Sequence, residues 1–417
     1  MHKHVCIFLV VMLGLLLFQC SNSTAPVNNN QPPDRTPAQL TANEKTLLES
    51  SNRFGLKLFQ RVNAEEPSDK NLFLSPLSVS YALGMTLNGA AGATFDSMAA
   101  TLEQAGLSLT EINEAYNSLE KILENADPSV VFNIANSIWS REDKEIKPLF
   151  IRRCGDYFDA VVRVMDFPEP ADTINQWVDV NTNGKIKDIV SSPLSPDIAL
   201  LILNAIYFKG DWCIPFDTSK SINGKFHTAA GTTVDCRFMV KASDEDTTLR
   251  YYKNELFRAV TIPYGNKGFC MSLFLPEGSF TVDDIIGQMT ASNWTAWLEG
   301  FCDDYILVIM PRFKFEYEIV LNRILQALGM EIAFNSSLAD FTNMFVDGIG
   351  WIDQVKHKTF VQVDEKGTEA AAVTSVSLID VSFMPLAFDR PFLFVIHEQT
   401  SHTILFIGKI TEPKWQD

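Results

Sequence analysis

The chain has 417 residues, 46% of them hydrophobic and 11% aromatic, which is enough length and apolar content for a large buried core. Its 34 basic and 51 acidic residues give a formal net charge of −17. Nucleic acids and anionic surfaces are bound through basic patches, so this charge balance excludes them from the expected partners.

The first residues have the features of an export signal. Residues 5–17 form an apolar run that is short for a membrane-spanning helix. Leu17 stands three residues before Cys20, as in the bacterial lipobox, although Gln19 replaces the small residue that is usual there. We predict a signal peptide over residues 1–19 and a lipid on Cys20, with plain secretion as the alternative.

Residues 20–45 are predicted to be a flexible tether. The stretch that follows Cys20 is rich in Asn, Pro, Ser and Thr, a composition that cannot form a core. The folded domain is then expected over residues 46–417. This organisation predicts an exported protein that is either anchored by its lipid in the cell envelope or released into the extracellular space.

Three helices are predicted in the first part of the folded chain. Thr41 and Glu44 form a capping box at the start of the first helix. Ser75 followed by Pro76 marks the start of the second helix, which should end near Gly89. The third helix is indicated by apolar residues at helical spacing, Ile112, Tyr116, Leu119 and Leu123.

Strands are predicted from short runs that are rich in β-branched and aromatic residues. These runs cover residues 131–139, 161–167, 200–208, 256–263, 269–275, 305–317, 392–397 and 403–410. Residues 398–401 should join the last two strands as a hairpin. Helices and strands are mixed without strict alternation, which favours an α+β fold. The sequence contains no internal repeat, so we expect a single domain.

The sequence lacks the motifs of common enzymes. It has no Gly-x-Ser-x-Gly, no phosphate-binding loop and no Gly-x-Gly-x-x-Gly. His397 and His402 are five residues apart, whereas a zinc-binding helix needs a spacing of four to place both on one face. We therefore expect no catalytic residue, no metal and no cofactor.

The segment 365–382 has mixed features of a loop and a strand. It opens with acidic residues and a glycine, then continues with small side chains and no proline before Pro385. Exposed loops are usually rich in Gly, Pro, Asn and Asp. In an extended chain, one face would carry only uncharged residues, Thr368, Ala370, Ala372, Thr374, Val376 and Leu378. The segment is therefore predicted to have two conformations, one as a loop and one as a strand.

Several separated motifs resemble the serpins, in the order and at the spacing of that family. They are NLFLSPLS (71–78), NAIYFKGDW (204–212), MPRF (310–313), VDEKGTEAAA (363–372), PFLF (391–394) and LFIG (405–408). The resemblance covers about residues 46–415 and, with Cys20, suggests a bacterial lipoprotein-type member. It implies a single-domain α+β fold with about nine helices, three β-sheets and an exposed reactive-centre loop at about residues 366–388.

The resemblance also implies a function and site residues. Serpins are suicide-substrate inhibitors of serine endopeptidases, and a cleaved reactive loop inserts into their main sheet. A non-inhibitory serpin that acts as a binding or chaperone-like module is the alternative. The implied hinge residues are Glu365, Gly367, Thr368, Glu369, Ala370, Ala371 and Ala372. The implied shutter and breach residues, which part when the loop enters, are Ser75, Ser78, Asn204, Trp212 and His357.

Family spacing from Glu365 places the reactive bond between Val381 and Ser382. The loop is one residue shorter than usual, so Asp380 remains the alternative bait residue. Val381 suits an elastase-like pocket, whereas Asp380 suits an aspartate-specific protease. The expected partner is a target serine protease in a covalent complex with a monomeric inhibitor. Residues 110–127 carry a single Lys among acidic residues, so no glycosaminoglycan partner is expected.

Overall fold

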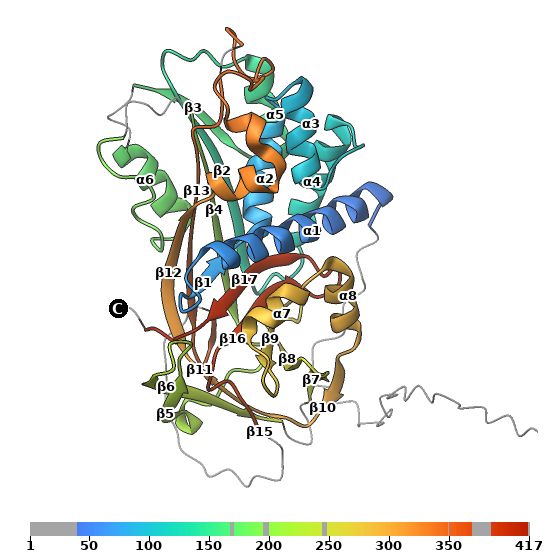
Figure 1. The fold of residues 1–417 in the computed structure, drawn as a ribbon, viewed down its shortest axis with the longest axis vertical. Coiled ribbons are helices and arrows are strands. Elements are labelled where there is room, and N and C mark those ends of the chain that lie inside the picture. The colour runs from blue at the N-terminus through green and yellow to red at the C-terminus, as the bar shows by residue number, and fades with distance from the viewer. Residues whose placement is uncertain are drawn as a thin grey trace, which may run out of the picture. The chain divides into compact units, whose positions relative to one another are not determined.

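The computed structural model describes residues 40–166, 171–194, 200–243, 248–348, 350–368 and 385–415. This part of the chain contains nine α-helices and three β-sheets, which confirms the α+β class and the predicted architecture (Figure 1). Among the helices of these residues, none has both the length and the apolar character needed to cross a membrane.

The three predicted helices are present, and the first two begin at their capping signals. Helix α1 (Ala42–Glu65) begins after Thr41, whose Oγ1 accepts from the Glu44 amide at 3.3 Å. It starts inside the segment that was assigned to the tether. Helix α2 (Pro76–Leu87) begins after Ser75, and all its residues are buried. The third is α4 (Leu109–Glu124). The others are α3 (Gly92–Thr101), α5 (Pro148–Phe158), α6 (Ala171–Asn181), α7 (Val282–Gln288), α8 (Ala291–Glu299) and α9 (Asn322–Leu325).

The strands form sheets of seven, four and six members. The seven-stranded sheet has the order β1 (Leu72–Leu74), β17 (Ile404–Ile410), β16 (Phe392–Glu398), β9 (Phe269–Pro276), β8 (Phe257–Pro263), β7 (Leu249–Lys253) and β10 (Cys302–Asp304). The four-stranded sheet has the order β15 (Pro385–Ala387), β11 (Leu307–Pro311), β6 (Thr233–Ala242) and β5 (Ile222–His227). The predicted hairpin is present, because β16 and β17 pair antiparallel.

The six-stranded sheet contains the residues of interest for function. Its order is β12 (Phe313–Val320), β13 (Gln354–Val363), β14 (Gly367–Thr368), β4 (Leu200–Asp211), β2 (Val131–Arg141) and β3 (Val161–Met165). Helix α6 packs on one face of this sheet, where a small apolar cluster joins it to β2 and β4 (Figure 1). The opposite face contributes to the main core.

One strand prediction is wrong, because residues 305–317 form two strands in different sheets. Strand β11 pairs with β6 in the four-stranded sheet, whereas β12 pairs with β13 in the six-stranded sheet. The change occurs at Arg312, whose amide still donates to the Arg237 carbonyl of β6 at 3.0 Å before the chain enters β12. The hydrophobic pattern continues through this point, so periodicity alone did not reveal the change of sheet.

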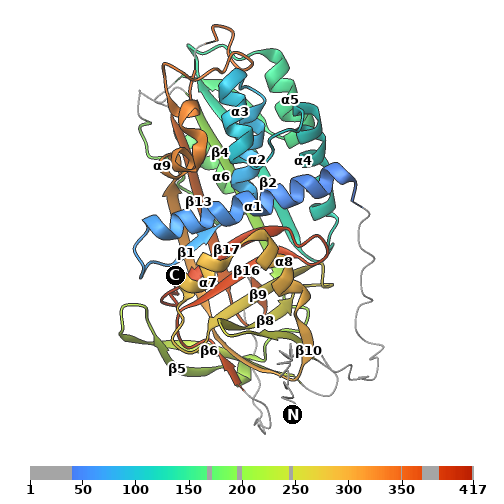
Figure 2. The same ribbon diagram turned by 45° about the vertical axis from the view of Figure 1, so that its right-hand side comes forward.

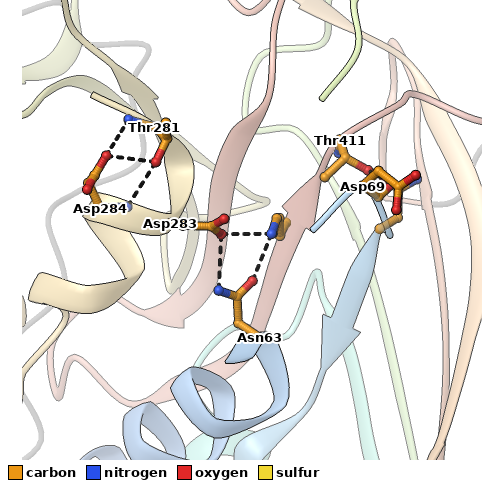
Figure 3. Close-up of polar contacts among 8 residues, drawn as sticks. Asn63, Asp69, Thr281, Asp283, Asp284 and Thr411 are labelled. Atoms are coloured by element: carbon orange, nitrogen blue, oxygen red, sulfur yellow. Dashed lines mark hydrogen bonds and ion pairs between the residues drawn. The ribbon is translucent and has the colours of Figure 1, made fainter. Parts of the chain in front are cut away.

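Helix α1 and the seven-stranded sheet are joined by a buried charge. Figure 2 shows α1 crossing between α2 and α4 on one side and β17 and α8 on the other. Lys409 of β17 is 1% exposed, and its Nζ binds Asn63 Oδ1 at 2.9 Å and Asp283 Oδ1 at 2.7 Å. Asn63 of α1 also donates to Asp283 of α7, and Figure 3 shows these two side chains facing each other. A single cation thus links the strand to two helices.

Candidate functional site

The two central strands of the six-stranded sheet, β13 and β4, pair directly at one end only. Gln354–Lys356 of β13 pair in parallel with Leu201–Leu203 of β4. Beyond these pairs, residues 357–362 and 204–209 have no ladder with each other within the described part of the chain. At the far end, β14 lies between the two strands. The two strands therefore separate. Gly367 and Thr368 of the predicted hinge fill one end of the gap between them.

Strand β14 is antiparallel to both of its neighbours. Thr368 pairs with Val363 of β13 and with Gly210 of β4, and Gly367 pairs with Asp211. A Cβ atom on Gly367 would lie 2.1 Å from the carbonyl oxygen of Gly210, so only glycine allows this approach. The hinge residues Gly367 and Thr368 are thus already part of the sheet.

A buried tyrosine holds Thr368 from inside the molecule. The Tyr264 hydroxyl and Thr368 Oγ1 are 2.8 Å apart, and Thr368 is 5% exposed. The Tyr264 ring stacks on Trp212, with ring centroids 4.4 Å apart. Burial raises the pKa of Tyr264 far above its usual range, so the hydroxyl stays neutral and can both donate and accept.

Trp212 binds the turn that leads into the hinge. Its Nε1 donates to the carbonyl oxygen of Asp364 at 2.9 Å, and its amide donates to that of Lys366 at 2.6 Å. The Glu365 side chain accepts from Ser221 Oγ at 2.7 Å and lies 3.5 Å from Arg237 Nε. The turn is therefore fixed both to β4 and to the four-stranded sheet.

His357 and Ser75 form one half of the predicted shutter. His357 Nε2 accepts from the Ser75 amide at 3.1 Å, and Ser75 Oγ donates to the Leu405 carbonyl at 2.8 Å. Burial lowers the pKa of His357 to about 4, so the imidazole is neutral and is an acceptor at neutral pH. This contact ties β13 to the first turn of α2.

Asn204 lies in a separate pair. Its Nδ2 donates to Asn136 Oδ1 at 2.5 Å, and Asn136 Nδ2 donates to the Phe158 carbonyl at 3.1 Å. Within the described residues, Asn204 makes no hydrogen bond to Ser75, Ser78 or His357. Two buried oxygen atoms, Asn204 Oδ1 and Ser78 Oγ, have no hydrogen-bond partner in this part of the chain. The structure thus joins His357 to Ser75, but it joins Asn204 to Asn136.

A pocket lies beside Thr368, at the point where the strands part. Its walls come from β4, from β13 and from the segment that follows α6. The lining residues are Thr182, Lys185, Ile186, Ile206, Tyr207, Phe208, Phe360, Gln362 and Thr368. The lining mixes apolar and polar side chains, and the Lys185 ammonium lies over the Phe360 ring.

Other predicted residues lie outside the described residues. They are Cys20, Glu369, Ala370, Ala371, Ala372, Asp380, Val381 and Ser382. In contrast, Tyr264, Asn136 and Arg237 are parts of the site that the sequence did not single out. Tyr264 becomes relevant through its contact with Thr368, Asn136 because β2 is a neighbour of β4, and Arg237 because it lies beside Glu365.

Comparison with known proteins gives a consistent result. The profile of the serpin family, described as serine protease inhibitor, matches residues 49–413. An uncharacterised serpin-like protein of Thermococcus kodakarensis is 31% identical over an alignment of 433 residues that covers 97% of this chain and 97% of that protein. Leukocyte elastase inhibitor of Homo sapiens is 30% identical over an alignment of 391 residues that covers 88% of this chain and 99% of that protein.

Solved structures show the same similarity. The crystal structure of a thermophilic serpin, tengpin, in the native state matches with a TM-score of 0.82 and 27% sequence identity. The match covers 92% of this chain and 97% of that one.

Proposed function

Because the chain belongs to the serpin family and has its fold, we propose that it is an irreversible suicide-substrate inhibitor of serine endopeptidases. This proposal rests on the separation of β13 from β4, with Gly367 and Thr368 already between the two strands. A strand that continued from Thr368 would extend β14 and find ladder partners on both sides. The rest of the loop is proposed to enter there.

The proposed reaction begins as an ordinary proteolysis. The serine hydroxyl of the protease attacks the carbonyl carbon of Val381, and its proton goes to the departing amine of Ser382. The Val381–Ser382 bond breaks, and Val381 becomes an ester of the protease serine. Insertion of residues 369–381 then carries the protease, still bound to Val381, along the sheet and distorts it before water hydrolyses the ester.

Insertion has a sufficient driving force. Roughly ten new ladder hydrogen bonds, each worth about 0.5–1.5 kcal/mol net, together approach the stability of a whole domain. Burial of the small side chains adds to this. The inward face from Thr368 to Leu378 carries no charge, so its burial leaves no ion without a partner.

The proposed target is an elastase-like protease. Val381 is small and apolar, and residues 367–389 contain no Lys or Arg for a trypsin-like pocket. One relative is named for the inhibition of leukocyte elastase. Mass spectrometry of the C-terminal fragment tests the bond, because a fragment that begins at Ser382 supports Val381 as bait. A fragment that begins at Val381 would instead assign the bait to Asp380.

The function itself is tested by covalent trapping. The protein is incubated with a panel of elastase-like and aspartate-specific proteases, and each mixture is run on a denaturing gel. A stable complex of inhibitor and protease is expected. If every protease only cleaves the loop, and if cleavage leaves the thermal midpoint unchanged, the chain is a non-inhibitory serpin that acts as a binding or chaperone-like module.

We also propose that the protein is exported as a monomer and anchored through a lipid on Cys20, without a glycosaminoglycan partner. The apolar run before Cys20 and the polar stretch after it support this. In a bacterial host, Cys20→Ala should move the protein from the membrane fraction to the soluble fraction. Equal membrane association of both forms would contradict lipidation and favour plain secretion.

A further inference from the structure

Helix α5 ends beside α4 in a strongly acidic part of the molecule. The two helices lie side by side, and Asn117 Nδ2 of α4 donates to the Asp156 carbonyl in the last turn of α5 at 3.3 Å (Figure 2). Helix α5 ends at Phe158, and Asp159 follows with a left-handed backbone, φ 43°. The C-terminal end of a helix carries a partial negative charge, so the helix does not stabilise an acidic residue at this place.

Glu120 of α4 is unusual because its carboxyl group is buried without a partner. It is 8% exposed, and within the described residues it makes no hydrogen bond and no ion pair. Glu124, one turn later on α4, and Asp159 are exposed and are likewise not paired with a cation in this part of the chain. Lys121 favours the ionised form of Glu120, but its Nζ donates to Asn117 Oδ1 at 2.6 Å. We call Glu120, Glu124 and Asp159 the acidic site.

The surroundings of Glu120 make its ionised form unfavourable. Burial, and after it the charges of Glu124 and Asp159, raise the pKa of Glu120 to about 7. Tyr81 of α2 lies on the inner side, but its hydroxyl donates to the Tyr116 carbonyl at 2.9 Å and not to Glu120. At neutral pH, about half of the Glu120 carboxyl groups are therefore ionised without a partner. A bound cation would remove this cost, because an opposite charge stabilises the carboxylate.

The spacing of the acidic site favours an organic cation over a metal ion. In the described residues, no group of three or more His, Cys, Asp or Glu side chains could hold a metal ion. Glu120 and Glu124 are one helical turn apart, which places their Cβ atoms about 5–6 Å from each other. The nearly buried Glu120 admits only a slender group, whereas Glu124 and Asp159 lie on the outside. A thin chain with ammonium groups separated by a few methylenes fits this arrangement.

We propose that the acidic site binds a linear polyamine, with one ammonium group at Glu120 and the next at Glu124 and Asp159. Each ammonium would donate to carboxylate oxygens in charge-assisted hydrogen bonds. A polyamine carries several positive charges and no acidic group, so it complements a chain with a net charge of −17. This inference is independent of the proposed function, because no residue of the acidic site belongs to the six-stranded sheet or to the reactive loop.

The experiment is a calorimetric titration of the full chain with spermidine at low ionic strength and pH 8. Saturable binding at one site is expected. Glu120→Gln keeps the size of the side chain and removes its charge, so it should weaken binding by about tenfold or more. Glu114→Gln is the matched control, since Glu114 is an exposed acidic residue of the same helix. It should weaken binding by less than about twofold, because exposed charges at this separation are screened.

The pH dependence tests the role of Glu120 separately. With a pKa of about 7, most Glu120 carboxyl groups are ionised at pH 8 and protonated at pH 6. Spermidine should therefore bind about tenfold more weakly to the wild type at pH 6, and Glu120→Gln should lose this dependence. Asp159→Asn changes an exposed residue and leaves the core unaltered, and it should weaken binding at both pH values.

Several results would overturn the proposal. If Glu120→Gln and Glu114→Gln weaken binding equally, or if binding does not saturate, spermidine responds only to the general negative charge of the protein. If affinity is the same at pH 8 and pH 6, Glu120 does not hold an ammonium group. If MgCl2 displaces spermidine much better than NaCl does at equal ionic strength, the residues form a metal site and the polyamine assignment is wrong.

Discussion

The seven-stranded and six-stranded sheets differ in how their central strands are joined. In the seven-stranded sheet, β9 pairs along its length with both β8 and β16, and β16 pairs with β17. Lys409 adds contacts to Asn63 and Asp283. In the six-stranded sheet, β4 pairs along its length with β2 but meets β13 at one end only. One sheet is complete, and the other has an unpaired stretch between two of its central strands.

The difference shows which contacts oppose a change of conformation. In the seven-stranded sheet, an added strand would have to break existing ladders. In the six-stranded sheet, opening breaks few ladder bonds, namely the pairs between Gln354–Lys356 and Leu201–Leu203. The contact of His357 with Ser75 also holds β13 to the start of α2. The following predictions test this contrast, from the largest expected effect to the smallest.

A charge at Thr368 should abolish trapping. Thr368→Arg would bury a cation without a partner next to Tyr264, at a cost of several kcal/mol. Insertion should stop, and the protease should cleave the loop as a substrate. Denaturing gels should show cleaved inhibitor and no covalent complex. Thr368→Ser is the control, since it keeps the hydroxyl contact. A complex at the wild-type yield in Thr368→Arg would disprove the role of this position.

Acid should weaken the six-stranded sheet through protonation of His357. Its pKa in the folded protein is about 4, below the ordinary value of 6.5. The unfolded chain therefore binds this proton more tightly than the folded protein. The resulting stability is fully present above about pH 6.5 and is lost as the pH falls towards 4. The loss amounts to roughly 3 kcal/mol, and protonation removes the acceptor of the Ser75 amide.

The measurement is the rate at which the uncleaved loop inserts into the six-stranded sheet of the intact protein. It is followed as the increase in heat resistance with time at pH 5 and pH 8. The wild type should convert faster at pH 5. His357→Gln keeps an acceptor without a titrating group and should lose this dependence. His397 of the complete sheet has a pKa lowered to about 3 by burial, so His397→Gln is the matched control. Equal pH dependence in the wild type and His357→Gln would show that another group is responsible.

Loss of Lys409 should weaken the complete sheet without affecting insertion. Lys409→Met leaves Asn63 and Asp283 without their shared cation and should cost about 1–3 kcal/mol of stability. The intact protein and the protein with a cleaved loop should lose the same free energy of unfolding, because the seven-stranded sheet is the same in both forms. Chemical denaturation of both forms checks the prediction. A loss confined to one form would mean that the two sheets are coupled.

The smallest effect is expected at Tyr264. Tyr264→Phe keeps the stacking on Trp212 but removes the partner of the Thr368 hydroxyl, a loss of about 1 kcal/mol. Strand β14 should leave the sheet more often. Hydrogen exchange at the Gly367 and Thr368 amides should accelerate several-fold, with exchange in β9 unchanged as an internal reference. Unchanged exchange at both amides would show that backbone pairing alone holds β14.

Local features of the fold could be predicted because they depend on neighbours in the chain. The capping box of Thr41 and Glu44 and the cap at Ser75 each join residues three positions apart, and both helices begin there. The hairpin between β16 and β17 is similarly local. The change of sheet at Arg312, within residues 305–317, could not be predicted. The apolar pattern continues unchanged from one strand into the other.

The site was only partly predictable for the same reason. The resemblance indicated Ser75 and His357, and these residues are in contact. It also grouped Asn204 with them, but the partner of Asn204 is Asn136, directly opposite on β2. Arg237 reaches Glu365 across more than a hundred residues of sequence. No local pattern indicates such a pair, because it depends on which strands become neighbours.

The sequence by itself determined an insertion face, because alternation along an extended chain needs only the order of residues. From Thr368 to Leu378 that face is free of charge. Only the tertiary structure decided where in the molecule such a face could be buried. The parting of β13 and β4, the entry of Gly367 and Thr368 and the unpaired oxygen of Asn204 all arise from strands that are distant in the chain. Their relative positions follow from packing of the whole domain, which no single segment encodes.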